Sequence, residues 1–322
     1  FFCDSKGVLC MAPKKYIDRM SDIYLRLFGT KPKTLYTSPL ERGDHPELDI
    51  SPKLDAADIK KYQSLIGAAQ WAVSLGRLDI ATAVMTLSSF RAAPKEGHLS
   101  RICRVFGYLT KMKHATIHFR TGIPDYSAVP IVEHGWQKTV YGDAQELVPD
   151  DALRPLGKPV LMTTFIDANL CHDMATGRAV TGIIHLINQT VIDFYSKKQP
   201  LVETATYGSE FMADRTGTEQ IIELCTTLRY LGVPIQGTSY MFGDNKTVVD
   251  SSINPASKLN KRHVILSYHR VREAIVAKIL YFSFINVKDN PANILSKAWG
   301  YSNIWPMLKT LLFWEGDTLD VE

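Results

Sequence analysis

Three carboxylates stand at the ends of predicted elements that lie far apart along the chain. Asp167 ends the buried-looking strand 159–168, Glu210 lies near the start of a long predicted helix, and Asp244 directly follows a short strand. Phosphodiester hydrolysis by two divalent ions needs carboxylates that hold both metals about 3.5–4 Å apart. Magnesium takes oxygen ligands and keeps several waters, so no His or Cys spacing is needed. The pattern predicts a shared site for divalent metal.

Each carboxylate taken alone also has a simpler interpretation. Asp244 precedes Asn245 and could cap a short helix that follows it, and Glu210 could be a solvated helical residue. Asp167 fits a simple structural role least well, because it follows Phe165 and Ile166 inside an apolar run, where an unpaired carboxylate is costly.

The elements after residue 158 must bring these side chains together. Apolar patterning predicts five strands, at 159–168, 178–188, 190–196, 239–243 and 279–287. Helices are predicted at 203–231, 245–252 and 261–278, and a last helix opens at Pro291. This order predicts an α/β arrangement, α+β over the whole chain, with one mixed five-stranded sheet flanked by helices. If the first and fourth strands are adjacent, Asp167 and Asp244 meet, and the long helix could bring Glu210 to them.

The chain before residue 158 has a different pattern. A strand pair is predicted at 1–3 and 8–11, followed by a helix over 13–28 and a linker rich in proline and charge. Residues 55–114 carry three amphipathic helical segments, which indicate a small helical subdomain with its own core. Residues 115–157 contain prolines, glycines and mixed charge without a period, and we expect a short strand or two and then a connector.

Composition leaves the function open. The chain has 322 residues and a net charge of +4, which permits a nucleic-acid partner without requiring one. Its five cysteines show no metal or redox spacing, so we expect reduced thiols in a cytosolic or nuclear protein. No apolar run approaches the roughly 18 residues that a membrane span needs. The start at Phe1, without Met or a signal-like core, suggests a cut through a longer polypeptide.

Basic residues near the predicted site could contact the phosphates of a nucleic acid, a kind of contact that fixes position without selecting sequence. A solvated basic surface explains them equally well. The candidates for nucleic-acid binding are Lys197, Lys198, Lys261, Arg262 and His263.

Several runs occur in a fixed order along nearly the whole chain. Before the connector these are Tyr62-Gln63-Ser64-Leu65-Ile66-Gly67, Gly76-Arg77-Leu78-Asp79-Ile80 and Arg104-Val105-Phe106-Gly107-Tyr108-Leu109. After it come Phe165-Ile166-Asp167-Ala168, Ser196-Lys197-Lys198-Gln199, Tyr207-Gly208-Ser209-Glu210-Phe211, Gly243-Asp244-Asn245, Lys261-Arg262-His263, Tyr268-His269-Arg270-Val271-Arg272-Glu273 and Asn290-Pro291-Ala292-Asn293-Ile294-Leu295-Ser296-Lys297. Together they resemble the C-terminal part of the Pol polyprotein of copia-type LTR retrotransposons, from the end of the reverse transcriptase through the ribonuclease H domain.

The resemblance implies a domain order. Residues 1–50 would be a remnant of the reverse transcriptase palm or thumb region, 51–120 a helical thumb- or connection-like subdomain, and 121–157 a connector. Residues 158–300 would form a ribonuclease H-like domain, and 301–322 a tail. The polymerase's Tyr-x-Asp-Asp strand would lie before residue 1, so no polymerase activity is expected.

The resemblance also implies a function. The chain would be a ribonuclease H that hydrolyses the RNA strand of RNA–DNA hybrids during reverse transcription, with two Mg²⁺ or Mn²⁺ ions held by Asp167, Glu210, Asp244 and Asn293. Its partners would be the hybrid, the upstream reverse transcriptase core and other Pol parts, with no membrane. Its location would be cytoplasmic, in virus-like particles, and also nuclear.

Asn293 departs from the family pattern, which has Asp at that position. An amide oxygen can coordinate a metal but brings no negative charge, so the second ion should bind more weakly. Asp289 lies four residues upstream, before the predicted helix, and is not assigned as a replacement. One alternative is therefore an impaired or inactive fragment that keeps the fold and hybrid binding. A transposase- or integrase-like nuclease is a weaker alternative, against which the Lys-Lys-Gln and Asn-Pro-Ala-Asn runs argue.

Overall fold

The structure is a computed structural model that describes residues 1–142, 144–146, 148, 150–151, 153–259 and 261–314. Its chain divides into two compact units. One unit comprises 1–119, 172–177 and the chain from Ile294 onward, and the other comprises 120–171 and 178–293. Each unit is described by itself below. Among the described residues, no helix is both long enough and apolar enough to cross a membrane.

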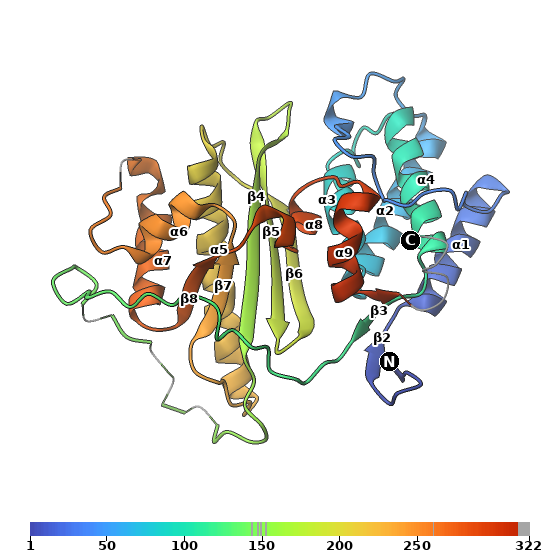
Figure 1. Ribbon diagram of the computed structural model, residues 1–322. Helices are drawn as coiled ribbons and strands as arrows, with labels where there is room; N and C mark the ends of the chain where they lie inside the picture. Colours follow the sequence, from blue (N-terminus) through green and yellow to red (C-terminus); the bar gives the residue numbers. More distant parts are fainter. Residues whose placement is uncertain (143, 147, 149, 152, 260, 315–322) are drawn as a thin grey trace. The chain divides into compact units, whose positions relative to one another are not determined.

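The second unit is built on a five-stranded sheet with the order β6-β5-β4-β7-β8 (Figure 1). Strand β4 pairs in parallel with β7, β7 pairs in parallel with β8, and β5 pairs antiparallel with β6. This arrangement confirms the expected mixed five-stranded sheet. The strands are β4 (Met162–Asp173), β5 (Arg178–Ile187), β6 (Thr190–Lys198), β7 (Ser239–Gly243) and β8 (Leu280–Phe284).

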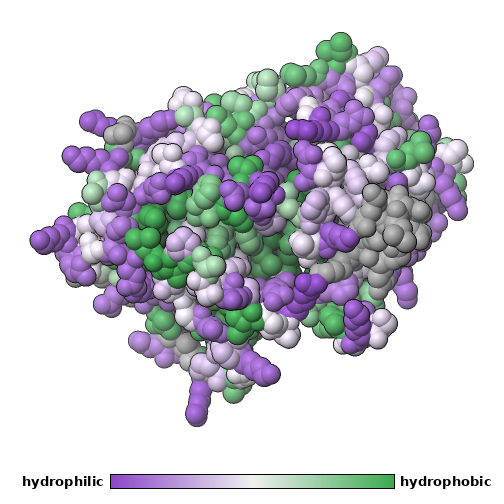
Figure 2. All heavy atoms as spheres, in the orientation of Figure 1, coloured by the Kyte–Doolittle hydropathy of each residue, from purple (hydrophilic) through white to green (hydrophobic). Residues whose placement is uncertain are grey.

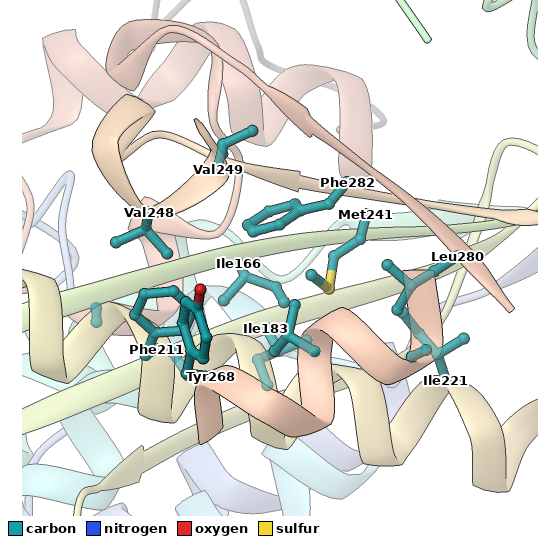
Figure 3. Packing of buried hydrophobic residues seen from close by; sticks show 14 of the residues in the cluster. Ile166, Ile183, Phe211, Ile221, Met241, Val248, Val249, Tyr268, Leu280 and Phe282 are labelled. Atoms are coloured by element: carbon teal, nitrogen blue, oxygen red, sulfur yellow. The ribbon is translucent and has the colours of Figure 1, made fainter. Parts of the chain in front are cut away.

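Three helices cover the sheet of this unit: α5 (Thr206–Tyr230), α6 (Lys246–Ile253) and α7 (Ile265–Val276), the last entered through the 3₁₀ turn η3 (Arg262–Val264). Apolar side chains of the sheet and helices form one core, in which Ile166 and Ile183 of the sheet meet Phe211 of α5 (Figure 3). Ile166 is fully buried in this core and directly precedes Asp167 on β4.

Aromatic rings also line β4 and β7. Phe165 stacks on Phe242, with ring centroids 5.2 Å apart, and Tyr126 from the connecting segment lies against Tyr240 and Phe242. Hydrophobic side chains gather on the visible face where Figure 1 draws β7 and β8, with hydrophilic residues around them (Figure 2). The connector therefore contributes to the packing of this unit.

The first unit contains a helical part, with helices where the sequence predicts them over residues 55–114. A buried ion pair organises it: Arg77 Nη2 lies 2.6 Å from Asp79 Oδ2, and the Tyr108 hydroxyl donates to the same oxygen at 2.8 Å. Two of the family-like runs thus meet at one buried hydrogen-bonded group. The elements are α1 (Lys14–Phe28), η1 (Pro46–Leu48), α2 (Ala56–Ser74), η2 (Leu78–Ile80), α3 (Ala81–Ser88) and α4 (Glu96–Lys111).

A small sheet with the order β1-β2-β3-β9 completes the first unit. Its last strand comes from the C-terminal chain, since Ala115 in β3 pairs with Trp314 in β9. The strands are β1 (Phe2–Cys3), β2 (Leu9–Met11), β3 (Ala115–His118) and β9 (Phe313–Trp314). Sequence patterning did not reveal β9, because this short strand forms through its pairing with β3, which is far away in the sequence.

The chain after Pro291 differs from expectation. A 3₁₀ turn η4 (Val287–Asp289) precedes Pro291, and the helix predicted to open there is the short α8 (Asn293–Ser296). The prediction that this helix is the last one is wrong, because a separate helix α9 (Tyr301–Leu311) follows Gly300. Gly300, the residue before α9, has an extended backbone, and this conformation separates α9 from the helix before it. Residues 301–314 of the expected tail are α9 and β9, and 315–322 lie outside the described residues.

Candidate metal centre

The three predicted carboxylates come together in the second unit. Asp167 on β4, Glu210 on α5 and Asp244 after β7 each offer one oxygen, and these oxygens all lie within 4.8 Å of one another. Asp167 and Glu210 are buried, with 3% and 6% of their surfaces exposed, and Asp244 is half-buried. Acidic residues are almost never buried this deeply unless they are paired or hold a cation.

The sheet register explains why two of them meet. Ile166 of β4 pairs with Gly243 of β7, and both strands run in the same direction. Asp167 on β4 and Asp244, directly after β7, are therefore the residues that follow this pair along two neighbouring segments. Asp244 does not cap α6, because that role belongs to Asn245, whose side chain accepts a hydrogen bond from Val248 N.

Glu210 is positioned by a glutamine that the sequence did not single out as functional. Gln199, directly after β6, donates from Nε2 to Thr181 Oγ1 on β5 at 3.0 Å and to the carbonyl of Ser209 at 2.8 Å. Gln199 thereby ties the first turn of α5 to the sheet next to Glu210. The only available signal was its place beside Lys197 and Lys198 in the family-like run.

A second residue missed from the sequence is Asn290, which is fully buried. Its Nδ2 donates to the carbonyl of Ile166 at 2.8 Å and lies 3.4 Å from Asp244 Oδ2, while its Oδ1 accepts from Ala292 N. Asn290 therefore links the backbone of β4 just before Asp167 to the side chain of Asp244. It lies inside the Asn-Pro-Ala-Asn run, which was the signal that could have indicated it.

Asn293 is buried in the same unit, with its amide already engaged. Its Nδ2 donates to the carbonyl of Val287 at 2.6 Å and to that of Asn290 at 2.9 Å. Both hydrogens of the Asn293 amide are therefore used in hydrogen bonds to the backbone of residues 287–290. A role of Asn293 in metal binding stays a prediction. Asp289 is exposed on η4, in keeping with its not being assigned to the site.

Asp214 is a fourth acidic residue near the cluster, one helical turn after Glu210 on α5. It is 2% exposed, and its Oδ2 has no hydrogen-bond partner among the residues that the structure describes. Burial, and then the neighbouring Asp244 carboxylate, raise the pKa of Asp214 well above its usual value. An i, i+4 spacing from Glu210 was the sequence signal for this residue.

The basic candidates lie on two segments of the second unit. Lys197 is exposed and Lys198 half-buried on the edge strand β6, whereas Arg262 and His263 are exposed in η3 and Lys261 is half-buried just before it. His263 Nε2 lies 2.8 Å from Oε2 of Glu203, which is buried. His263 is thus partly committed to an intramolecular contact, and nucleic-acid binding by these residues stays a prediction.

The three clustered carboxylates suit a hard divalent cation. Two unit charges 4.8 Å apart repel by about 3–4 kcal/mol at an effective dielectric constant of about 20. A cation bound between them replaces this repulsion with attraction, and all three donors are oxygens, which Mg²⁺ prefers and Mn²⁺ accepts. The residues present therefore fit such an ion.

Known proteins are similar to most of the chain. It is 24% identical over 298 residues to the retrovirus-related Pol polyprotein from transposon TNT 1-94 of Nicotiana tabacum, covering 90% of this chain and 19% of that protein. It is 22% identical over 271 residues to that from transposon RE1 of Arabidopsis thaliana, covering 84% and 16%. No protein-family model matches the chain. These relatives confirm the resemblance to retrotransposon Pol polyproteins, of which the chain spans about a fifth.

Among solved structures, the chain is similar to the N-terminal ribonuclease H domain of a Mycobacterium tuberculosis protein, determined as a fusion with maltose-binding protein. The likeness covers 47% of this chain and 98% of that one, at 12% identity and a TM-score of 0.35.

Proposed function

We propose that the chain is the ribonuclease H part of a retrotransposon Pol polyprotein and hydrolyses the RNA strand of RNA–DNA hybrids. The observation that carries this proposal is the convergence of Asp167, Glu210 and Asp244 within 4.8 Å. The order of strands and carboxylates, together with the Pol relatives, supports this reaction rather than the cutting of DNA by a transposase or integrase.

The side chains have distinct roles in this proposal. Asp167, Glu210 and Asp244 hold two Mg²⁺ or Mn²⁺ ions, with Asn293 as a weaker fourth ligand. When bound, these ions activate the attacking water and stabilise the leaving oxygen. Gln199 fixes the start of α5 and so the position of Glu210, and Asn290 holds the orientation of Asp244.

Selection of the hybrid would come from its shape and from the ribose 2′-hydroxyl, which distinguishes RNA from DNA. Lys197, Lys198, Lys261, Arg262 and His263 would contact phosphates. The upstream reverse transcriptase core and other Pol parts would be partners of the intact polyprotein. The site of action would be cytoplasmic virus-like particles and the nucleus.

The test is cleavage of a labelled RNA strand in a hybrid with magnesium. Asp167→Asn should reduce the rate by about 100-fold or more, because a metal ligand loses its charge. Asp193→Asn is a matched control, since Asp193 is an exposed aspartate on β6 of the same sheet. Equal loss in both variants, or retained activity in Asp167→Asn, would contradict the proposed role of Asp167.

Asn293 favours a second candidate function, a fragment that binds hybrid but turns over slowly. Asn293→Asp restores the charge that the family has, but a carboxylate cannot donate to the carbonyls of Val287 and Asn290. We expect faster cleavage together with a loss of about 1–3 kcal/mol of stability. Activity assays and denaturant melts check both parts. A stable variant with an unchanged rate would show that Asn293 does not limit the enzyme.

A further inference from the structure

A second cluster of metal-binding side chain types lies in the small sheet of the first unit. Asp4, Cys10 and His118 each offer one ligand atom, and these three atoms all lie within 4.8 Å of one another. They come from the turn after β1, from β2 and from β3. This cluster takes no part in the proposed nuclease and contains a different set of donor atoms.

Strand register brings Cys10 and His118 together. The two residues are direct cross-strand partners in the antiparallel pair of β2 and β3, so their side chains project from the same face of the sheet. Cys10 is fully buried, and the His118 side chain is only 14% exposed. A thiol and an imidazole are thus held side by side on a rigid element with little access to water.

The turn between β1 and β2 supplies the carboxylate. Asp4 Oδ1 accepts hydrogen bonds from Lys6 N at 2.8 Å and Val8 N at 2.9 Å, and Gly7 completes the turn with a positive φ of 76°. With Oδ1 held in this way, Asp4 Oδ2 lies 3.6 Å from His118 Nε2.

We propose that Asp4, Cys10 and His118 form a binding site for a transition-metal ion of the Zn²⁺ type. Thiolate, imidazole and carboxylate together are the ligands that Zn²⁺ takes, whereas Mg²⁺ and Ca²⁺ prefer oxygen donors alone. Three protein ligands leave a fourth position for water. The wide spacing of the three residues along the sequence, with none of the usual short Cys or His intervals, explains why the sequence alone did not indicate this site.

Binding requires one proton to leave. The Cys10 thiol donates to the carbonyl of Val8 at 3.3 Å, and it must give up its proton to become a ligand. The sulfur–metal bond forms, the S–H bond breaks and the proton goes to solvent, with no oxidation or reduction. The ion would join β1, β2 and β3 at one point.

Cobalt provides the test, because Co²⁺ replaces Zn²⁺ and a thiolate ligand produces a charge-transfer absorption that oxygen ligands cannot produce. The full chain should develop this absorption on titration with Co²⁺, and Zn²⁺ should displace it. Cys10→Ser should abolish it. Cys3→Ser is the matched control, since Cys3 is exposed on the adjacent strand, and it should leave the absorption unchanged.

Two further variants separate this site from the carboxylate cluster. His118→Gln should weaken Co²⁺ binding by at least about tenfold, because one ligand is lost. Asp167→Asn should leave the absorption unchanged, since Asp167 belongs to the other unit. Absence of the absorption at saturating Co²⁺ in the folded full chain, or its persistence in Cys10→Ser, would overturn the proposal.

Discussion

At the residue scale, buried carboxylates distinguish the candidate metal centre from ordinary surface acids. Asp167 and Glu210 are almost entirely removed from water, and Asp214 is buried one helical turn further along α5. Helix capping and solvated surface charge, the simpler interpretations of Asp244 and Glu210, do not hold. Asn245 caps α6 and Glu210 is buried.

Asp214 gives a prediction about pH and stability. Since burial raises its pKa in the folded state, the folded protein binds the proton more tightly than the unfolded chain does. The contribution of the protonated Asp214 side chain to stability is therefore present at low pH. This contribution is lost as pH rises from the pKa of Asp214 in the unfolded chain toward its higher pKa in the folded protein. The loss of stability is roughly 1.4 kcal/mol for each unit by which the two pKa values differ.

Asp214→Asn should consequently be more stable than the natural chain at neutral pH, and the difference should grow as pH rises from about 4. Urea melts across this range with a chelator present measure it. Asp193→Asn, an exposed aspartate of the same unit, should show no such trend. A constant difference between Asp214→Asn and the natural chain at all pH values would exclude a raised pKa for Asp214.

At the element scale, two glycines of the family-like runs differ in the space around them. Gly107 on α4 leaves no room for a side chain, because a methyl group there would contact the carbonyl oxygen of Lys33 and would lie 2.8 Å from Tyr36 Cδ2. For Gly67 on α2, no described atom other than its chain neighbours and the nearby backbone of its own helix lies within 4 Å of such a methyl group. Both glycines are in helices of the first unit.

The two glycines should therefore respond oppositely to alanine. Gly107→Ala should cost about 1–3 kcal/mol, since the Lys33 backbone must move. Gly67→Ala should gain about 0.5–1 kcal/mol, because glycine is a poor helix residue. Thermal or chemical unfolding of the two variants gives the comparison. Equal effects at both positions would indicate that α4 does not contact the 33–36 segment.

The sequence predicted elements whose patterns are local and strong. The helix over 13–28 and the strand 239–243 appear as α1 and β7, because apolar spacing and stop signals lie within each segment. It also indicated Asp167, Glu210 and Asp244, since Asp167 follows a strong apolar run and the other two lie near the ends of predicted elements. In the structure, β4 continues past Asp167 to Asp173. Gln199 and Asn290 were not indicated, because their roles depend on hydrogen bonds to distant backbone groups. The β9 strand depends on a partner almost 200 residues away.

At the scale of the whole molecule, the two units do not follow contiguous segments of chain. The first unit includes the C-terminal chain from Ile294 onward, where Thr82 donates to the carbonyl of Ile294 and β9 pairs with β3. The second unit includes the connector, where Tyr126 donates to Thr163 Oγ1 and packs on Tyr240. The expected division at 158 and 300 remains a prediction about independent folding.

Fragments can test where the boundary of folding lies. We expect a fragment of residues 120–293 to melt cooperatively at a higher temperature than one of 158–300, because the latter lacks Tyr126 and its ring contacts. Residues 1–50 alone should not fold. Thermal melts with limited proteolysis measure this, and a fragment 158–300 as stable as 120–293 would show that the connector adds nothing to the fold.

The most direct test of the central claim is cleavage of a hybrid in which both strands carry different labels, beside a DNA duplex of the same sequence. With magnesium, we predict that only the RNA strand shortens, that the DNA duplex stays intact, and that a chelator or Asp167→Asn stops the reaction while Asp193→Asn does not. Cleavage of the DNA strand, or RNA cleavage that persists in Asp167→Asn, would contradict a ribonuclease H centred on these carboxylates.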